Sequence, residues 1–426
     1  MGRSKKQYKQ AVKERKENRK HEDKRAGRLS VLLDRRDFIL SMTLLLLCSL
    51  GIIMLYSASS YVCSIKEEYN YDSLYLFKRQ TVFLVAGIVA MLLVRRFISY
   101  NFIDRGIAVM AYVSMIVLAI ALKTPLGHTV KGARRWIKLG GFTFQPAELY
   151  KIALIISLAV AIKYYYQYLS ITLNLFIFWV IFIIPIGLLF FISNDLSSCA
   201  VMAGMVFMTT FVCSRNKKIH FLVMAAVVFI GLLLVMYALK SGGGGDNFRY
   251  NRVNAWLNPE AFIKYEGYQI MQGLYAIASG GLFGKGLGNS YQKLGPIPEA
   301  HNDMIFSIIC EELGIVGAAV VIGLFIILIF HIIKISGDSR NIVGSVMTLN
   351  VALHIGLQAI INIAVNTNTI PNTGIALPFI SYGGTALFCL LLEMGLVYAV
   401  ERQNRIETAR TIIRVSDENN LENYLE

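Results

Sequence analysis

The sequence is poor in charge for its length. Only 16% of its 426 residues are Asp, Glu, Lys or Arg, whereas 55% are hydrophobic. Soluble globular proteins carry about 25% charged residues, so this composition argues against a soluble enzyme. Cysteine is scarce as well. The six cysteines form no CxxC pair and most of them fall within or beside apolar runs, which excludes a disulfide framework.

Long apolar runs occupy most of the chain. A helix needs about 20 residues to cross roughly 30 Å of hydrocarbon, and ten runs approach that length. They lie near 38–56, 81–94, 106–122, 148–163, 172–192, 196–213, 219–239, 304–333, 342–364 and 377–399. The first run follows a long polar tail and is itself long enough to span, so we expect an anchor and no cleavable signal peptide. The sequence therefore predicts an all-α polytopic membrane protein with ten transmembrane helices across 38–400.

The tail at 1–37 is strongly basic, with 14 Lys and Arg against 6 Asp and Glu. Nucleic-acid binding is one interpretation of such a tail. Beside a first span, however, positive charge more often fixes orientation and contacts anionic lipid, because it is retained on the cytoplasmic side. The even-numbered connections are also basic, and Arg402, Arg405, Arg410 and Arg414 follow the last apolar run, in the second tail at 401–426. We therefore expect both tails in the cytoplasm and no nucleic-acid partner.

The third connection, which precedes Glu148, departs from this charge pattern. It must be external, yet all of its charged residues are basic, namely Lys123, Lys131, Arg134, Arg135 and Lys138. Guanidinium groups form paired hydrogen bonds with phosphate oxygens, and an indole such as that of Trp136 prefers headgroup depth. The pattern favours an anionic ligand at the outer interface. The alternative is a basic loop that only contacts outer-leaflet lipid.

The seventh connection, about 240–303, is far longer than the others and is predicted to form a large external loop. Long ordered loops tend to be functional. Its segment YQIMQGLYAIA is too short to span and predicts an interfacial or re-entrant helix. The glycine-rich stretch SGGLFGKGLGNS fails the spacing of a phosphate-binding loop. Its glycines are predicted to form tight turns or to allow close approach of helices.

Polar residues and helix breakers occur where other apolar runs begin. Pro146 and Glu148 suit the first turn of a helix, and Lys151 can pair with Glu148 three residues earlier. That pair is either structural or part of a site wall. Asp195 and Glu393 are interpreted as structural. The segment TNTIPNTGIALPFISYGGTA, 367–386, predicts irregular backbone that lines a cavity.

Three segments together resemble the SEDS family, whose members act in shape, elongation, division and sporulation. They are GARRWIKLGGFTFQPAELYK, GYQIMQGLYAIASGGLFGKGLGNSYQKLGPIPEAHNDMIFSIICEELG and NTGIALPFISYGG. The longest of the three is more similar to the division and sporulation members than to the elongation members. The resemblance implies a bacterial peptidoglycan glycosyltransferase of the cytoplasmic membrane. It would polymerise lipid II, an undecaprenyl-pyrophosphate-linked disaccharide pentapeptide, and work with a class B penicillin-binding protein and other division or sporulation membrane proteins.

The resemblance also implies residue roles. Asp303 matches the essential carboxylate of the family, Arg135 and Trp136 match its loop residues, and Glu148 and Lys151 match its helix-four pair. A sugar hydroxyl is a poor nucleophile, so Asp303 is expected to act as general base. The pyrophosphate leaving group, expelled with inversion, calls for preorganised cations. The candidates for substrate binding are Arg134, Arg135, Trp136, Lys138, Glu148, Lys151, Lys285, Gln292, Glu299 and His301. Lys293 is an alternative to Lys285 as a cation for the leaving group.

The cofactor prediction is open. A divalent cation such as Mg²⁺ or Mn²⁺ fits between a pyrophosphate and a carboxylate, but the sequence shows no closed ligand set. Glu299 and His301 are expected to tune Asp303, bind an ion or cap the following helix. For His301 we favour hydrogen bonding over metal binding.

Two other function classes compete with the enzyme. A lipid II flippase would need charged groups along a path through the membrane. The unusual residues concentrate instead in two external loops and the adjoining helix ends, which favours an enzyme. A scaffold that only recruits partners leaves those loops unexplained.

Overall fold

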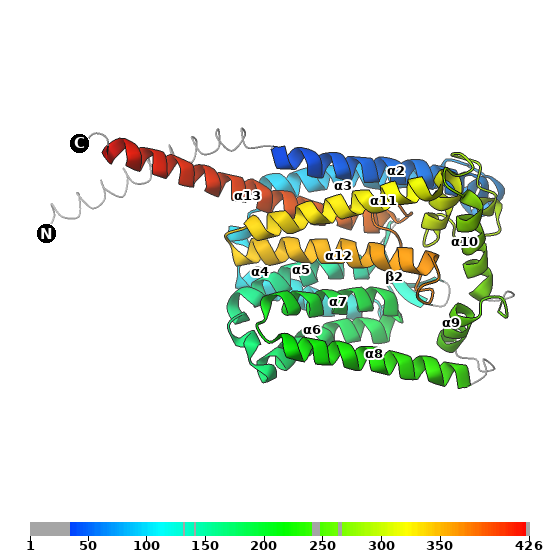
Figure 1. The fold of residues 1–426 in the computed structure, drawn as a ribbon, viewed down its shortest axis with the longest axis horizontal. Helices are drawn as coiled ribbons and strands as arrows, with labels where there is room; N and C mark the ends of the chain where they lie inside the picture. Colours follow the sequence, from blue (N-terminus) through cyan, green and yellow to red (C-terminus); the bar gives the residue numbers. More distant parts are fainter. Residues whose placement is uncertain (1–34, 131–132, 140–141, 241–247, 263–265, 423–426) are drawn as a thin grey trace.

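The computed structural model describes residues 35–130, 133–139, 142–240, 248–262 and 266–422. They form a bundle of long helices, with a small sheet and two short helices at one end, which we call the loop end (Figure 1). At the opposite end α13 leaves the bundle. We call it the basic end, because its connections carry Arg95, Arg96, Arg105, Arg215, Lys218, Lys334 and Arg340. Most of the predicted tail at 1–37 lies outside the described residues.

Ten long helices build the bundle. They are α2 (Arg35–Ile65), α3 (Tyr75–Phe97), α4 (Arg105–Ala121), α5 (Pro146–Tyr165), α6 (Thr172–Ser193), α7 (Leu196–Cys213), α8 (Lys217–Lys240), α11 (Ile305–Asp338), α12 (Ile342–Asn366) and α13 (Gly384–Glu422). Among the described residues, eight helices are long and apolar enough to cross a membrane. The other two are α4, with 17 residues, and α5, which carries Glu148, Lys151 and Lys163. Each predicted apolar run overlaps one of these helices, so the all-α membrane architecture is confirmed.

The last helix differs from the prediction at both ends. The predicted run began at 377, but α13 begins at Gly384, because Pro378 and Gly383 favour the non-helical backbone seen at 377–383. The sequence contains no glycine or proline from 396 to 422, and the helix continues to Glu422. The predicted tail at 401–426 is therefore helical as far as it is described.

The third connection folds into a small antiparallel sheet, which the sequence analysis did not predict. Strands β1 (Gly127–Val130), β2 (Ala133–Leu139) and β3 (Phe142–Phe144) lie in chain order. The pairing sets His128 opposite Trp136 and Ile137 opposite Phe144. Alternate side chains of β2 therefore point to opposite faces, with Ile137 buried and Lys138 exposed.

The seventh connection holds two short helices, α9 (Phe248–Leu257) and α10 (Glu266–Gly280), and the 3₁₀ turn η4 (Gln292–Leu294). Further 3₁₀ turns are η1 (Glu67–Tyr69), η2 (Tyr100–Phe102) and η3 (Tyr168–Ser170). Helix α10 contains the segment predicted to be helical, and it runs across the bundle axis at the loop end (Figure 1). That direction suits a helix at the membrane surface.

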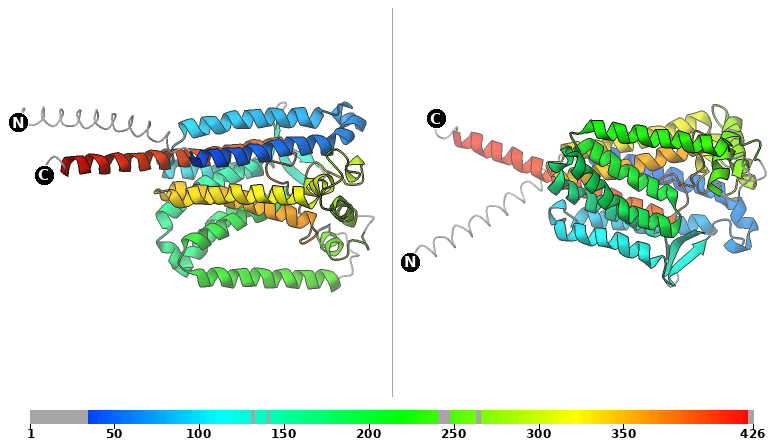
Figure 2. Two further views of the ribbon diagram at one scale, coloured as in Figure 1. Left: turned by 45° about the horizontal axis from the view of Figure 1, so that its top comes forward. Right: turned by 90° about the horizontal axis from the view of Figure 1, so that it is seen from below.

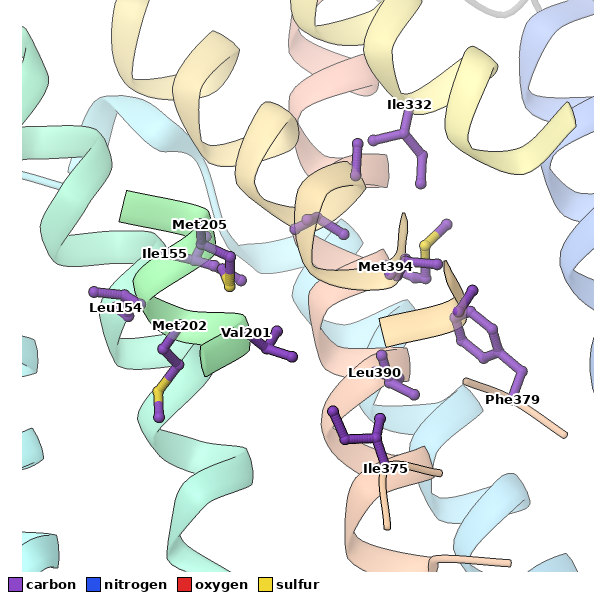
Figure 3. Close-up of a cluster of buried hydrophobic side chains, with 14 of the residues drawn as sticks. Leu154, Ile155, Val201, Met202, Met205, Ile332, Ile375, Phe379, Leu390 and Met394 are labelled. Atoms are coloured by element: carbon purple, nitrogen blue, oxygen red, sulfur yellow. The ribbon is translucent and has the colours of Figure 1, made fainter. Parts of the chain in front are cut away.

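The core lies between the inner faces of α5, α7, α12 and α13. Figure 3 shows part of it, including Leu154, Ile155, Val201, Met202, Met205, Leu390 and Met394. Helix α8 lies at the margin of the bundle in every view, and most of its side chains are exposed (Figure 2). The packed helices α11, α12 and α13 therefore form the rigid support for the loop end.

Candidate active site

Asp303 lies at the loop end, directly before Met304 and the start of α11, and its side chain is half-buried. Two amides of α12 hold its main chain. Nδ2 of Asn362 and Nδ2 of Asn366 each donate to the Asp303 carbonyl oxygen over 2.8 Å. From α10, Gln269 Nε2 lies 3.3 Å from Asp303 Oδ1. The residue is therefore fixed from two helices.

The predicted irregular segment lies beside this carboxylate. Asn362 also donates to the carbonyl of Ile375 over 2.7 Å, and Gln358 donates to that of Ala376 over 3.0 Å. Gly374 is exposed and has φ 71°, and a Cβ added there would lie 3.8 Å from Asp303 Oδ2. The carboxylate thus lies near an exposed glycine of this segment.

The residues before Asp303 are tied to the segment that leads into α13. The Tyr382 amide donates to the His301 carbonyl over 2.9 Å, and Ser381 Oγ donates to the Asn302 carbonyl over 2.6 Å. The Asn302 amide donates to the Glu299 carboxylate. His301 is buried, with its ring 5.9 Å from that of Tyr382. Both predicted supporting residues, Glu299 and His301, therefore lie in one hydrogen-bonded frame with Asp303.

Two phenols border this frame. Burial raises the pKa of Tyr382, and the Arg79 guanidinium opposes that change. Burial also raises the pKa of Tyr69 to about 12, and the negative charges of Glu68 and Glu299 add to the effect. Both phenols therefore stay uncharged at neutral pH and keep a hydroxyl proton to donate.

Three cations of the third connection, Arg134, Arg135 and Lys138, lie on β2. Arg134 Nη2 donates to the Thr124 carbonyl over 2.7 Å, and Arg135 Nη2 donates to the Asn194 carbonyl over 3.1 Å. Trp136 is half-buried and Lys138 is exposed. The two guanidinium groups are therefore held in place by backbone carbonyls that leave their positive charge uncancelled.

The turn between α6 and α7 links this sheet to the segment beside Asp303. Gln145 Nε2, at the start of α5, lies 3.2 Å from Asp195 Oδ2, and Asp195 also accepts from Ser198 as the cap of α7. Ser197 Oγ then donates to the Thr373 carbonyl over 2.5 Å. The start of α7, next to the turn that holds Arg135, and the α12 amide that holds Asp303 therefore both bond to the segment 373–376.

The predicted pairing of Glu148 and Lys151 is confirmed. Their Oε2 and Nζ atoms lie 2.9 Å apart in the first turns of α5, and both side chains are at least nine-tenths buried. Burial of two charges is costly unless each satisfies the other. Their predicted place in the wall of a substrate site stays a prediction.

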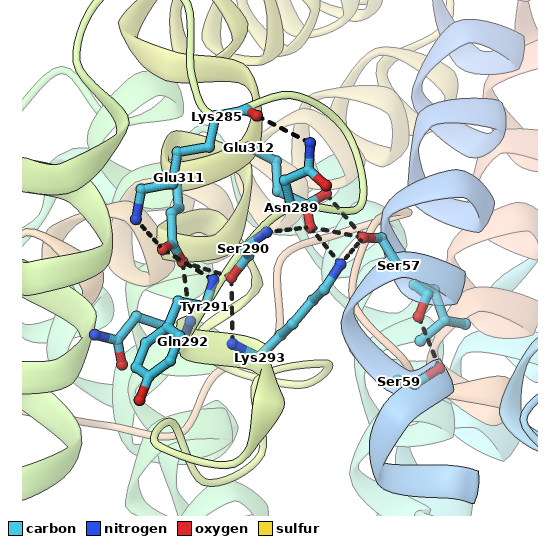
Figure 4. A network of polar contacts seen from close by, with 11 residues as sticks. Ser57, Ser59, Lys285, Asn289, Ser290, Tyr291, Gln292, Lys293, Glu311 and Glu312 are labelled. Carbon is cyan, nitrogen blue, oxygen red and sulfur yellow. Dashed lines mark hydrogen bonds and ion pairs between the residues drawn. The ribbon is translucent and has the colours of Figure 1, made fainter.

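Lys285 and Lys293, two of the predicted leaving-group cations, lie in a polar network near the start of α11, at the loop end (Figure 4). Lys285 Nζ is 2.7 Å from Glu311 Oε1, and Lys293 Nζ is 2.7 Å from Glu312 Oε1. The main-chain amide of Gln292 donates to Glu311 over 3.3 Å. In this arrangement the charges of both lysines are balanced inside the protein, which favours the cations of the β-sheet for binding phosphate.

The residues of the frame do not make a metal centre on their own. Over the described ranges, no three His, Cys, Asp or Glu side chains gather as metal ligands would. Asp303 and its neighbours therefore offer no closed ligand set. The divalent cation of the sequence analysis stays a prediction, and substrate oxygens would have to complete its coordination.

Sequence reasoning missed the amides that hold Asp303. They belong to a row in which every fourth residue of α12 is polar and buried, namely Asn350, His354, Gln358, Asn362 and Asn366. Residues four apart share one helix face, so the spacing itself was the available signal. In the same row, His354 Nδ1 is hydrogen-bonded to Glu393 Oε2 of α13 over 2.7 Å, and both side chains are buried. The interpretation of Glu393 as structural is consistent with this placement.

The family follows from a comparison with known sequences. Residues 38–406 match the family described as Cell cycle protein, which comprises FtsW, RodA and SpoVE. The chain belongs to this family. The match covers nearly the whole described bundle, so the resemblance to SEDS proteins is confirmed.

Curated relatives extend over most of the family region. The chain is 36% identical to a probable peptidoglycan glycosyltransferase FtsW of Trichlorobacter lovleyi over 365 residues, which are 85% of this chain and 92% of the relative. It is 32% identical to stage V sporulation protein E of Bacillus subtilis over 373 residues, 87% of this chain and 98% of the relative.

Two solved structures share the fold. A chain from a peptidoglycan synthase complex, studied for its coordination of polymerization and crosslinking, superposes with a TM-score of 0.66 at 24% identity and covers 86% of this chain and 97% of that one. The rod shape determining protein RodA of Thermus thermophilus gives a TM-score of 0.59 at 24% identity, with coverage of 86% and 96%. The helical arrangement is therefore that of the FtsW/RodA/SpoVE family.

Proposed function

We propose that the chain is a peptidoglycan glycosyltransferase that polymerises lipid II at the outer face of the bacterial cytoplasmic membrane, in division or sporulation. The observation that carries the proposal is Asp303. Its carboxylate lies near an exposed glycine at the loop end, while two buried amides hold its main chain. The name of the FtsW relative, a probable peptidoglycan glycosyltransferase, supports the same reaction class.

In the reaction, Asp303 accepts the proton of the 4-hydroxyl of GlcNAc on one lipid-linked disaccharide. The hydroxyl oxygen forms a bond to the anomeric carbon of MurNAc on the growing chain, with inversion. The bond between that carbon and the pyrophosphate oxygen breaks, and undecaprenyl pyrophosphate leaves. A base within hydrogen-bond reach contributes typically about 10²- to 10⁴-fold to such a step.

The leaving group adds negative charge at the membrane surface. Arg134 and Arg135 are held by backbone carbonyls, and Lys138 is exposed on the same strand. Fixed cations stabilise developing charge without reorganising during the reaction. We assign these three residues, with Trp136 at headgroup depth, to the pyrophosphate end of the substrate.

The same charge distribution supports an orientation. Cations gather in the connections at the basic end, as expected for the cytoplasmic side. We therefore propose that the end of α13 and the start of α2 lie on the cytoplasmic side and Asp303 on the outer side. A class B penicillin-binding protein is the proposed partner, and the fold shared with a chain of a peptidoglycan synthase complex supports it.

The test is polymerisation of purified lipid II by the reconstituted chain with its partner, with and without divalent cations. Asp303→Asn keeps the shape of the side chain and removes the base. We expect no glycan product from this variant, while its melting temperature and partner binding stay unchanged. Substantial polymer from Asp303→Asn would contradict the assignment.

A lipid II flippase is the second candidate, because buried charges do occur within the bundle. The pairs Glu148–Lys151 and His354–Glu393 lie between helices, where the sequence analysis expected few such groups. Both pairs are closed, with side chains no more than 8% exposed, so they line no open path. Vesicles in which labelled lipid II changes leaflet without forming glycan would favour the flippase.

A further inference from the structure

The loop that follows α10 is held rigidly against α11. We call Gly281–Leu294 the clamped loop. Glu311 accepts from Lys285 Nζ and from Ser290 Oγ, and Glu312 accepts from Lys293 Nζ and from Ser57 Oγ of α2 (Figure 4). Both carboxylates are fully buried. Two neighbouring glutamates of one helix therefore fix both halves of the loop.

Backbone bonds fix the start of the clamped loop at one level of α11. The amides of Ile315 and Val316 donate to the carbonyls of Gly281 and Leu282 over 3.0 and 3.1 Å. These bonds exist because α11 breaks at Gly314, which has φ 69°. A Cβ at Gly314 would lie 2.4 Å from the Leu282 carbonyl oxygen, so only glycine permits this approach.

The break in α11 coincides with the outer edge of its exposed apolar row. From Ile305 to Glu312 every residue is buried, whereas exposed apolar residues recur after the break. They are Ile315, Val316, Val320, Ile322, Ile326, Ile327, Phe330 and Ile333. The 19 residues from Ile315 to Ile333 span about 28 Å, close to the hydrocarbon thickness of about 30 Å, and Lys334 follows. The outer hydrocarbon boundary therefore lies near Ile315.

A span of the same length on α2 reaches the same level. Its sequence begins with Arg35 and Arg36, and its first exposed apolar residue is Phe38. A further span of about 28 Å from Phe38 ends near Tyr56. The next residue, Ser57, donates to Glu312 in the network that holds the clamped loop. Both helices thus place this network at the membrane boundary.

The clamped loop presents large apolar side chains at that level. Leu282 is 63% exposed and Phe283 is 79% exposed, and Leu287, Tyr291 and Leu294 are exposed as well. Apolar side chains grouped at an interface gain free energy when they enter the boundary between headgroups and acyl chains. We propose that the clamped loop is a membrane anchor that inserts Leu282 and Phe283 into the outer headgroup–acyl boundary. This inference does not depend on the proposed reaction.

The anchor has a consequence for Asp303. Because the loop is bonded to α11 just after its break, and Asp303 lies just before the same helix, lipid contact by Phe283 fixes the height of the carboxylate above the membrane. A lipid-linked substrate presents its sugars at a height set by the same lipid surface. The anchor therefore keeps the two heights matched.

The test measures the depth of a fluorescent label in vesicles that contain the full chain alone. Phe283→Cys labelled with NBD reports the anchor, and Leu287→Cys is another reporter in case the first variant folds poorly. Val320→Cys marks the hydrocarbon, and Glu260→Cys, exposed in the connection between α9 and α10, marks water. Phosphatidylcholine–phosphatidylglycerol vesicles carry nitroxides near the headgroup or near the chain end.

We expect the label at 283 to emit at shorter wavelength than the label at 260. Its quenching should be strongest with the nitroxide near the headgroup, whereas the label at 320 should respond most to the deep nitroxide. Emission at 283 and 287 like that at 260, with no quenching by either lipid, would overturn the proposal. That outcome would favour a protein partner on this surface.

Discussion

Asn366 donates its side-chain amide to the main-chain carbonyl of Asp303 over 2.8 Å, and Asn362, one turn earlier on α12, donates to the same oxygen at the same distance. The proposed base is thus positioned through its backbone, while Gln269 Nε2 lies 3.3 Å from its carboxylate. Because α12 is buried along this face, the positions of both amides are set by the core of the bundle.

The first prediction concerns this positioning. Asn366→Leu removes a donor and should shift Asp303, and a displacement of about 1 Å can cost about 10²-fold in rate. We expect kcat for lipid II polymerisation to fall by about 10- to 100-fold, while KM changes little. Asn366→Gln keeps an amide and should recover part of the rate. Initial rates over a range of lipid II concentrations give both constants.

Asn350→Leu is the matched control for this variant. It removes a buried amide from the same face of α12, but its partner is Thr209 on α7, and it lies about four turns from Asn366. We expect a lower melting temperature with an unchanged kcat. If Asn366→Leu behaves like Asn350→Leu while Asp303→Asn is inactive, the amide is merely structural and the base assignment stands.

The second prediction compares two ion pairs of equal length. Lys293–Glu312 and Lys78–Asp72 both measure 2.7 Å, but the first is buried and the second is exposed. Glu312→Gln leaves the Lys293 ammonium buried without a counter-charge, which should cost about 3–5 kcal/mol of unfolding free energy. Asp72→Asn should change stability little, because solvent screens that pair. Thermal unfolding in detergent compares the variants. An equal loss of stability in both would contradict the conclusion that Glu312 holds the clamped loop in place.

The sequence predicted these elements unequally. Apolar runs of membrane length identified the long helices, and glycine spacing indicated the tight turns at 281–288, where Gly281, Gly284, Gly286 and Gly288 have positive φ. The sheet at 127–144 was missed, because its strands are short and alternate weakly. The support of Asp303 was missed as well, because Asn362 and Asn366 lie 59 and 63 residues away in sequence. A contact between distant segments leaves no local pattern.

The third prediction concerns the cations of β2. Lys138 is exposed, and Lys138→Glu replaces attraction for pyrophosphate with repulsion. We expect this variant to bind lipid II more weakly than wild type at low ionic strength. The difference in affinity should shrink as the salt concentration rises, because salt screens charges over about 10 Å at 0.1 M. Lys218→Glu, exposed at the basic end, should bind normally. Equal binding by both variants at every salt concentration would remove Lys138 from the site.

The fourth prediction concerns the buried pair between α12 and α13. His354 and Glu393 are fully buried, and in the described structure His354 Nε2 and Glu393 Oε1 have no hydrogen-bond partner. Either single change, His354→Leu or Glu393→Leu, should lower stability by about 3–5 kcal/mol, because the remaining group stays buried and unpaired.

The double variant separates packing from function. His354→Leu with Glu393→Leu removes both polar groups, and replacement of a buried pair by apolar residues is often neutral or stabilising. We therefore expect the double variant to recover most of the stability that either single change loses, as a double-mutant cycle of melting temperatures would show. It should also polymerise lipid II, since neither residue is assigned to the reaction. If the double variant is stable but does not polymerise lipid II, this pair is required for the activity of the protein.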